Sequence, residues 1–135
     1  SRAQLAAEVI RPALDSGQCV LCDRYISSTI AYQGAGGADV EAIRAVGLVA
    51  VGRTWADLTI ILDIDPQEGL IRAGKAGAAD RIESKDLEYH RKVRELFLLQ
   101  ARNEPGRYAV IDASGGVEQV QQRLRDAIAN WQWQP

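Results

Sequence analysis

The sequence has almost no excess of charge of either sign and no long apolar run. Its 135 residues include 16 Lys and Arg and 18 Asp and Glu, which gives a net charge of −2. A chain this close to neutral predicts no basic face for duplex nucleic acid. No apolar run approaches the roughly 18 to 20 residues that cross a bilayer, and no signal peptide is recognisable. We therefore expect a cytoplasmic protein that binds neither nucleic acid nor membranes.

Cysteine and histidine are also scarce, which limits redox and metal chemistry. Cys19 and Cys22 are the two cysteines, and His90 is the single histidine. The C-x-x-C spacing permits a redox pair or half of a metal site. On a strand, however, residues i and i+3 point to opposite faces, so the thiols would not converge. We predict that both cysteines are small buried strand residues in a reducing compartment and that His90 is structural or solvated.

Short apolar runs alternate with longer segments of helical period. Asp39 and the pair Asp65 and Pro66 are helix-start signals, and Pro12 should kink or restart the first helix. Strands separated by helices indicate an α/β fold with a parallel sheet in a single domain, residues 1–135. Three strands are few, and their edges need partners, so we expect a sheet that is incomplete at the N-terminus. The predicted strands are 18–23, 58–64 and 107–112, and the predicted helices are 1–16, 26–33, 39–52, one starting at 65–66, 85–103 and 117–130.

Residues 18–34 form the most informative stretch. An apolar run ends in Asp23 and Arg24, and a hydroxyl-rich segment then leads to Tyr32, Gln33 and Gly34. A buried strand that ends in an acid and a base and turns into a helix is typical of a ligand site in a parallel sheet. A surface turn with an ordinary Asp-Arg pair remains the alternative, because such short motifs are common.

Several further motifs follow one another along the chain: Ser1 to Gln4, Val9 to Leu14, Asp23-Arg24-Tyr25, Ser27-Ser28-Thr29, Ala31 to Gly34, Asp57 to Asp63 with Pro66 and Gly69-Leu70, Asp80 to Glu83, Val93 to Glu95 and Ile111 to Ser114. In this order they resemble the thymidylate (dTMP) kinase family. The resemblance covers residues 1–130, and it implies a three-layer parallel sheet of the P-loop nucleotide kinase type and transfer of the ATP γ-phosphate to dTMP with Mg²⁺. It also implies a homodimer, for which helix 1–16 is a plausible contact surface. The rival readings are another nucleoside monophosphate kinase and a non-catalytic nucleotide-binding or dimerisation fragment.

The largest departure from the family is a missing motif. The family's first strand ends in a P-loop, but no G-x-x-x-x-G-K-[ST] occurs in these 135 residues. Without it, the amide cradle, the lysine and the Mg²⁺-binding hydroxyl for the donor phosphates are absent. The chain therefore looks like the C-terminal two-thirds of the enzyme, and we predict that it has no useful kinase activity by itself.

The resemblance also assigns the acceptor site. Arg24 would hold the dTMP phosphate and steady the transferring group, because a guanidinium fork matches phosphate geometry. Asp23 would orient Arg24 or waters on Mg²⁺, or simply cap the turn. Tyr32 would lie against the deoxyribose, or it could instead be an aromatic residue of the core. For Arg24, the alternative is a surface ion pair with Asp23. The thymine would be read by Arg2, Thr29 and Gln33.

The donor side is assigned more coarsely. Residues 72–81 resemble the family's lid, in which Arg72 and Arg81 would stabilise charge on the transferring phosphoryl group. Lys75 is only near a motif position, and Lys does not replace Arg there. Arg72 and Ser114 would contact ATP, the latter by backbone contacts to adenine. Paired carboxylates such as Asp63 and Asp65 can do acid-base chemistry, but we interpret them as a strand-end residue and an N-cap.

Overall fold

The computed structural model describes residues 2–73 and 84–132, and the chain divides into two compact units, residues 1–56 and 57–135. The predicted lid falls largely outside the described residues, and so do Lys75 and Arg81. No helix in the described ranges is both long and apolar enough to cross a membrane.

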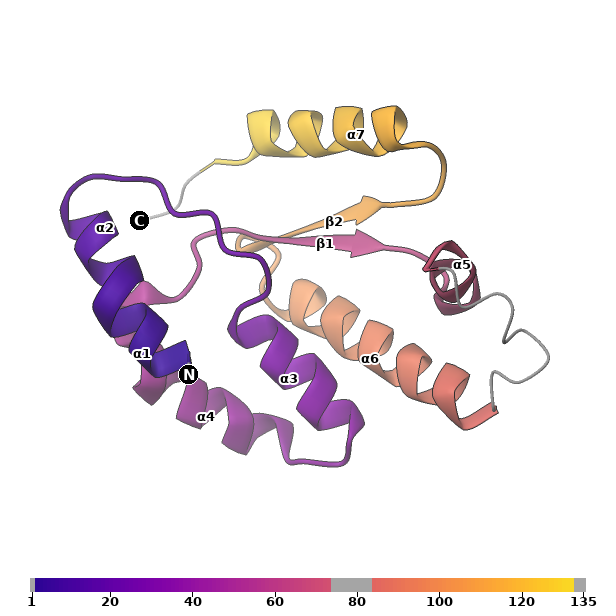
Figure 1. Cartoon of the computed structure of the whole chain (residues 1–135), viewed down its shortest axis with the longest axis horizontal. Coiled ribbons are helices and arrows are strands. Elements are labelled where there is room, and N and C mark those ends of the chain that lie inside the picture. The colour runs from indigo at the N-terminus through magenta and orange to yellow at the C-terminus, as the bar shows by residue number, and fades with distance from the viewer. Residues whose placement is uncertain (1, 74–83, 133–135) are drawn as a thin grey trace. The chain divides into compact units, whose positions relative to one another are not determined.

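Unit 1 is helical throughout its regular part (Figure 1). Its core is formed by side chains from three segments: Ala6, Ile26 with Ile30, and Val51, with Tyr25 packed against them. The elements are α1 (Arg2–Leu5), the π-helical segment η1 (Ala6–Ile10), α2 (Arg11–Asp15), α3 (Ile26–Ala35), α4 (Val40–Val51) and the 3-10 turn η2 (Gly52–Thr54).

The first helix contains a π-helical turn that follows from Pro12. A proline has no amide hydrogen, and its ring crowds the carbonyl four residues earlier, which is that of Glu8. The helix widens before this point, so that the Arg11 amide donates to the Ala6 carbonyl, and regular α-helix resumes at Arg11. The predicted restart at Pro12 is confirmed, whereas the π turn was not anticipated.

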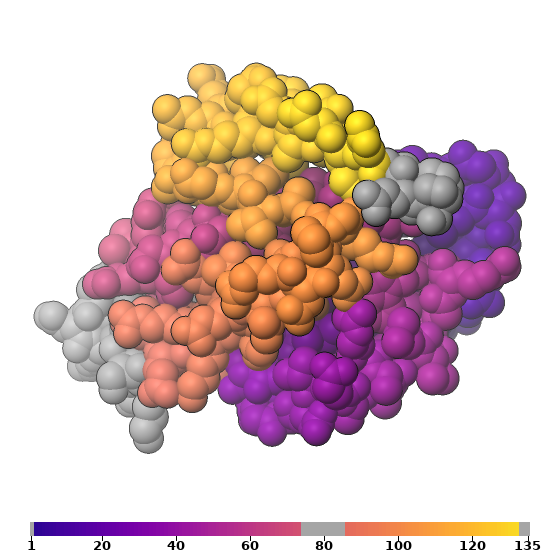
Figure 2. All heavy atoms as spheres, turned by 180° about the vertical axis from the view of Figure 1, so that it is seen from behind, coloured from indigo at the N-terminus to yellow at the C-terminus, as the bar shows by residue number. Residues whose placement is uncertain are grey.

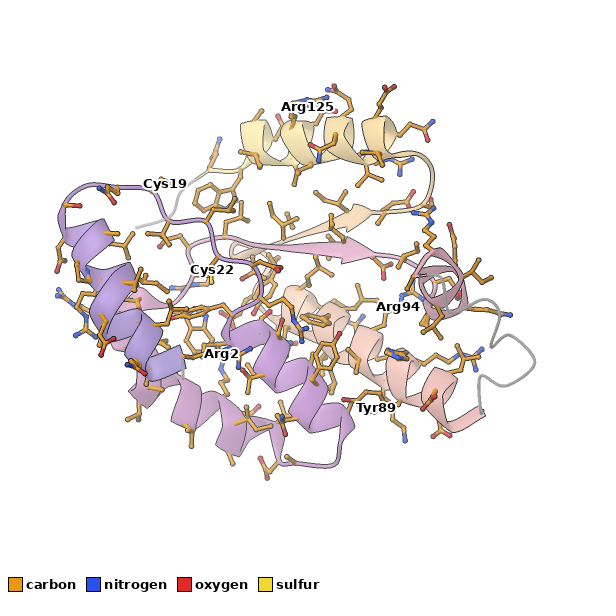
Figure 3. All side chains as sticks on the ribbon, viewed as in Figure 1. Arg2, Cys19, Cys22, Tyr89, Arg94 and Arg125 are labelled. Carbon is orange, nitrogen blue, oxygen red and sulfur yellow. The ribbon has the colours of Figure 1, made fainter. Side chains whose placement is uncertain are left out.

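The predicted strand at 18–23 is wrong. Residues 18–23 form no helix or strand, and the sheet of the described residues has two strands, neither of them from this segment. An apolar run becomes a strand only when a neighbouring strand satisfies its backbone groups, and here the Leu21 side chain is 97% exposed. The buried placement of Cys19 and Cys22 is wrong for the same reason, because both thiols are exposed on this segment (Figure 3).

Unit 2 is built on two parallel strands, β1 (Thr59–Asp63) and β2 (Tyr108–Asp112), which pair from Thr59 with Tyr108 to Asp63 with Asp112. Its helices are α5 (Pro66–Arg72), α6 (Ser84–Asn103) and α7 (Val117–Asn130). Helices α6 and α7 lie on opposite sides of the strands in Figure 1, and α7 forms a continuous yellow ridge in Figure 2. Ile61, Ala101 and Tyr108 form the core, with Phe97 packed against it.

The local start signals of the helices are confirmed. The Asp39 carboxylate accepts a hydrogen bond from the Ala42 amide at 2.9 Å, and α4 begins at the next residue. The Asp65 carboxylate accepts from the Gln67 amide at 2.9 Å, with a proline at the first helical position of α5. Both are N-caps, in which a side-chain oxygen satisfies an amide that has no partner inside the helix.

Candidate functional site

Arg24 is held along one face of α3. Its Nε atom donates to the Ser28 hydroxyl at 3.5 Å, and its guanidinium carbon lies 4.5 Å from the centroid of the Tyr32 ring. Arg24, Ser28 and Tyr32 are spaced four residues apart, so the arginine before the helix reaches one turn along it. A cation over an aromatic face is stabilised by the negative charge density of the ring. Within the described part of the chain, both Nη groups of Arg24 lack a hydrogen-bond partner.

Thr29 and Gln33 follow Ser28 and Tyr32 on the same helix and therefore lie on an adjoining face. The Thr29 hydroxyl oxygen is buried and accepts or donates no hydrogen bond among the described residues. Burying a hydroxyl without a partner costs roughly 1–3 kcal/mol, and a polar ligand atom would remove this cost only where neighbouring atoms move to admit it. Gln33 is exposed.

Asp23 and Arg2 are less closely tied to these residues. Asp23 is exposed, and in the described ranges no ion pair joins it to Arg24, so the surface ion pair considered from the sequence is not formed. Arg2 is half-buried at the start of α1. It lies one turn before Ala6, which belongs to the core formed with Ile26, Ile30 and Val51, so Arg2 is on the side of its helix that faces this core.

In unit 2, the carboxyl end of β1 carries a bidentate ion pair. Arg94 of α6 donates to the Asp63 carboxylate from Nε at 2.6 Å and from Nη2 at 2.8 Å. Figure 3 shows Arg94 on α6 near this end of the strand. The hydrogen bond to Asp63 raises the pKa of Arg94 above its usual value, against the effect of partial burial. The pair joins α6 to β1 at one fixed point, because two parallel bonds also fix the orientation of the guanidinium.

The turn after β2 is held by two arginines from different helices. Arg72 of α5 donates from Nη1 to the Ala113 carbonyl at 2.8 Å. Arg123 of α7 donates from Nη1 to the carbonyls of Asp112 and Ser114, at 2.7 and 2.8 Å. Three consecutive carbonyls therefore accept hydrogen bonds from positively charged groups, which fixes the conformation of the turn.

Asp112 adds negative charge to this turn. Hydrogen bonds from the side chain and the backbone of Ser114 lower the pKa of the Asp112 carboxyl, and the charges of Arg123 and Arg72 lower it further. The Arg123 guanidinium lies 3.1 Å from the Asp112 carboxylate. The turn thus contains a carboxylate that stays ionised to low pH.

The two residues predicted for the donor nucleotide are brought together here, because Arg72 binds the carbonyl next to Ser114. The Ser114 amide already donates to Asp112 at 2.8 Å, and its carbonyl accepts from Arg123. A backbone contact from Ser114 to adenine would therefore have to share groups that have protein partners. Arg81 lies outside the described residues.

Metal ligands do not cluster in the part of the chain that the structure describes. No group of three or more His, Cys, Asp and Glu side chains is placed to hold a metal ion there. Mg²⁺ commonly binds through phosphates and water with few protein ligands, and the described residues offer it no protein cage.

Comparison with known proteins identifies the family. The thymidylate kinase family model matches residues 1–124. A thymidylate kinase of Deinococcus radiodurans is 45% identical over 130 residues, which are 96% of this chain and 63% of that protein. The chain belongs to the thymidylate kinase family. Thymidylate kinases of Alcanivorax borkumensis and Nitratidesulfovibrio vulgaris (strain DP4) are 43% and 46% identical over 100% and 94% of this chain, and it spans 65% and 59% of their lengths. The chain therefore covers less than two thirds of these relatives.

Family membership confirms the resemblance drawn from the motifs, but three residues, one in unit 1 and two in unit 2, were not given a role from the sequence. The Ser28 hydroxyl accepts a hydrogen bond from Arg24, Arg94 binds the Asp63 carboxylate, and Arg123 binds carbonyls of the turn after β2. Arg94 lies within the motif Val93 to Glu95, so the sequence did contain a signal that could have assigned it a role. Nothing in the helical period separates Arg123 from its neighbour Arg125, which points away from the strands in Figure 3.

Proposed function

We propose that this chain is part of a thymidylate kinase that transfers the γ-phosphate of ATP to dTMP, giving dTDP for dTTP synthesis. Membership of the family supports the reaction class. The observation that carries the assignment is the guanidinium of Arg24, held 4.5 Å from the centroid of the Tyr32 ring. The planar fork of an arginine binds a phosphate through two parallel hydrogen bonds and stays charged.

In this proposal, Arg24 binds the acceptor phosphate and Tyr32 lies against the deoxyribose. Thr29 gives its unpartnered hydroxyl to a polar atom of the thymine, and Gln33 and Arg2 donate to its carbonyl oxygens. Asp23 orients Arg24 or waters on Mg²⁺. Phosphoryl transfer depends mainly on positioning and on stabilising charge, and these side chains supply the positioning of the acceptor.

The donor side rests on Arg72, Arg81 and Ser114. When bound, ATP supplies the phosphoryl group, and Mg²⁺ neutralises charge on its phosphates. Arg72 is anchored at the turn after β2 through Ala113, where it can stabilise negative charge on a bound nucleotide. Arg81 is proposed for the same task on the transferring group.

The wider family properties are also proposals. We propose a single domain with a three-layer parallel sheet, of which β1 and β2 with α6 and α7 are a part. We also propose a cytoplasmic homodimer. The helix at 2–15 supports the dimer, because Leu5, Val9 and Leu14 are all exposed on it, and exposed apolar patches mark interaction surfaces.

A second candidate is favoured by the missing P-loop motif. No G-x-x-x-x-G-K-[ST] occurs in the 135 residues, so the chain alone would be a module that binds nucleotide without transferring phosphate. Incubation of the purified chain with ATP, Mg²⁺ and dTMP tests the predicted inactivity: we expect no dTDP, and measurable turnover would contradict this expectation. The DNA upstream of Ser1 separates the two candidates, because a Gly-Lys-Thr motif in frame there would support the kinase and its absence would support the module.

Acceptor choice tests the proposed substrate. Titration of the chain with dTMP, dUMP, AMP and CMP, followed by NMR or calorimetry, should give the lowest dissociation constant for dTMP. If AMP or CMP binds as tightly as dTMP, the chain belongs with a different nucleoside monophosphate kinase activity.

A further inference from the structure

Arg24 has an unusual backbone. Its φ is +61°, and it is the one non-glycine residue in the described ranges with a positive φ. An L-residue other than glycine, asparagine or aspartate rarely adopts this region, because its Cβ crowds the backbone. Such a conformation persists when the surrounding structure holds it, and it is concentrated at functional sites.

The residue that follows is held firmly. The side chain of Tyr25 packs against the core formed by Ala6, Ile26, Ile30 and Val51. Its hydroxyl lies 3.2 Å from the hydroxyl of Thr54, 29 residues further along the chain. Tyr25 is also the N-cap residue of α3, and its carbonyl accepts from the Ser28 amide. The backbone next to Arg24 is therefore fixed by the core, by α3 and by Thr54.

The direction of the hydrogen bond to Thr54 can be assigned. The Thr54 hydroxyl donates its single proton to the Val51 carbonyl at 2.8 Å. Its oxygen is then left to accept, so the Tyr25 hydroxyl must be the donor. Thr54 is buried, at 5% exposure, in the turn η2 that ends α4. The result is a directed chain of two hydrogen bonds from Tyr25 through Thr54 to Val51.

We propose that Thr54 is a positioning residue for the acceptor phosphate. By accepting from Tyr25 it fixes the start of α3, maintains the left-handed backbone of Arg24, and so keeps the guanidinium over Tyr32. The phosphate role of Arg24 rests on the function proposed above, whereas the effect of Thr54 on the Arg24 backbone does not. Thr54 stands in none of the motifs that resemble the family, and its role follows from the contacts alone.

The test compares Thr54→Val, which keeps the side-chain shape and removes the hydroxyl, with Thr54→Ser, which keeps the hydroxyl. Two properties are measured by NMR: the intraresidue amide-to-Hα NOE of Arg24, which is strong when φ is positive, and the dissociation constant for dTMP. We expect Thr54→Val to weaken the NOE and to raise the dissociation constant roughly five- to tenfold, as the loss of one hydrogen bond implies. Thr54→Ser should retain both properties.

Two further variants complete the design. Tyr25→Phe removes the same hydrogen bond from the other side, so it should reproduce the effect of Thr54→Val, and the double variant should be no worse than either single one. Thr59→Val makes the same isosteric change in β1 of unit 2 and should leave Arg24 unaffected. Tyr25→Phe also serves if Thr54→Val does not fold.

An unchanged Arg24 NOE in both Thr54→Val and Tyr25→Phe would overturn the proposal, whatever happens to affinity. A weakened NOE with unchanged dTMP affinity would also overturn it, because the backbone would then not position the site. If the unmodified chain does not bind dTMP, the acceptor assignment fails, and the NOE alone decides whether Thr54 sets the Arg24 backbone.

Discussion

Replacing Arg94 with Ala removes the bidentate ion pair at the carboxyl end of β1. The Asp63 carboxylate then loses two charge-assisted hydrogen bonds, of 2.6 and 2.8 Å, while its side chain is only 21% exposed. Hydrogen bonds to charged groups contribute about 1.5–3 kcal/mol. The Arg94 side chain is 40% exposed, and solvent screening reduces the contribution of such a pair to about 1–2 kcal/mol.

This loss is measurable in equilibrium unfolding. For a chain of this size, about 1–2 kcal/mol lowers the Tm by roughly 4–8 °C. Urea unfolding at neutral pH, followed by circular dichroism, gives the free energy of unfolding directly. Arg91→Ala is the matched control, because Arg91 is an exposed arginine one turn earlier on α6 and the change in net charge is the same.

A double-mutant cycle separates the pair from its surroundings. Asp63→Asn alone and Arg94→Ala alone should each destabilise, and the double variant should cost less than their sum, because only one interaction is lost. If Arg94→Ala matches Arg91→Ala within about 0.5 kcal/mol, the ion pair does not join α6 to β1 in the way that the structure indicates.

Two further predictions concern Asp65 and Asp112. Asp65→Ala should lower the free energy of unfolding by about 1 kcal/mol, because the amides of Gln67 and Glu68 lose their acceptor. Asp65→Asn keeps an acceptor oxygen and should keep most of this free energy. Equal urea midpoints for Asp65→Ala and Asp65→Asn would contradict the N-cap role of Asp65. The pKa of the folded Asp112 carboxyl is lowered, so its stabilising contribution is present above the unfolded-state value of about 3.9 and is lost as the pH falls through the lower folded value. Asp112→Asn should therefore show a smaller loss of stability below about pH 4 than the unmodified chain, and identical acid-unfolding curves would refute this sign.

Local signals in the sequence predicted much of the fold. The start of α4 at Asp39 and of α5 at Asp65 depends on a side chain and an amide two or three residues away, so the information is contained in a few adjacent residues. The runs that became β1 and β2 could be predicted because each is strongly apolar and the two pair with each other.

The failures concern interactions between distant parts of the chain. The segment 18–23 is as apolar as β1, but a strand needs a hydrogen-bonding neighbour, and composition does not supply one. The exposed thiols of Cys19 and Cys22 follow from the same missing partner. The π turn of η1 is the one local exception, because it follows from the crowding of Pro12 against the carbonyl of Glu8 four residues earlier.

The candidate site was predictable in part. Arg24, Thr29, Tyr32 and Gln33 were named from a motif, and the helix that carries the last three formed as expected, at Ile26–Ala35. What the sequence could not provide was the geometry. The position of Arg24 over Tyr32 depends on a left-handed backbone. Glycine is the one residue type whose presence predicts that conformation with any reliability.

The binding of dTMP and of thymidine to Arg24→Ala tests the central assignment most directly, since the two ligands differ only in the phosphate. Calorimetric titration should show dTMP affinity reduced roughly 10- to 100-fold, as the loss of hydrogen bonds to a charged group implies, with thymidine affinity unchanged. Arg53→Ala, at an exposed arginine of the same unit, should bind both ligands as the unmodified chain does. An equal loss for dTMP and thymidine, or no loss of dTMP affinity, would contradict the assignment of Arg24 to the acceptor phosphate.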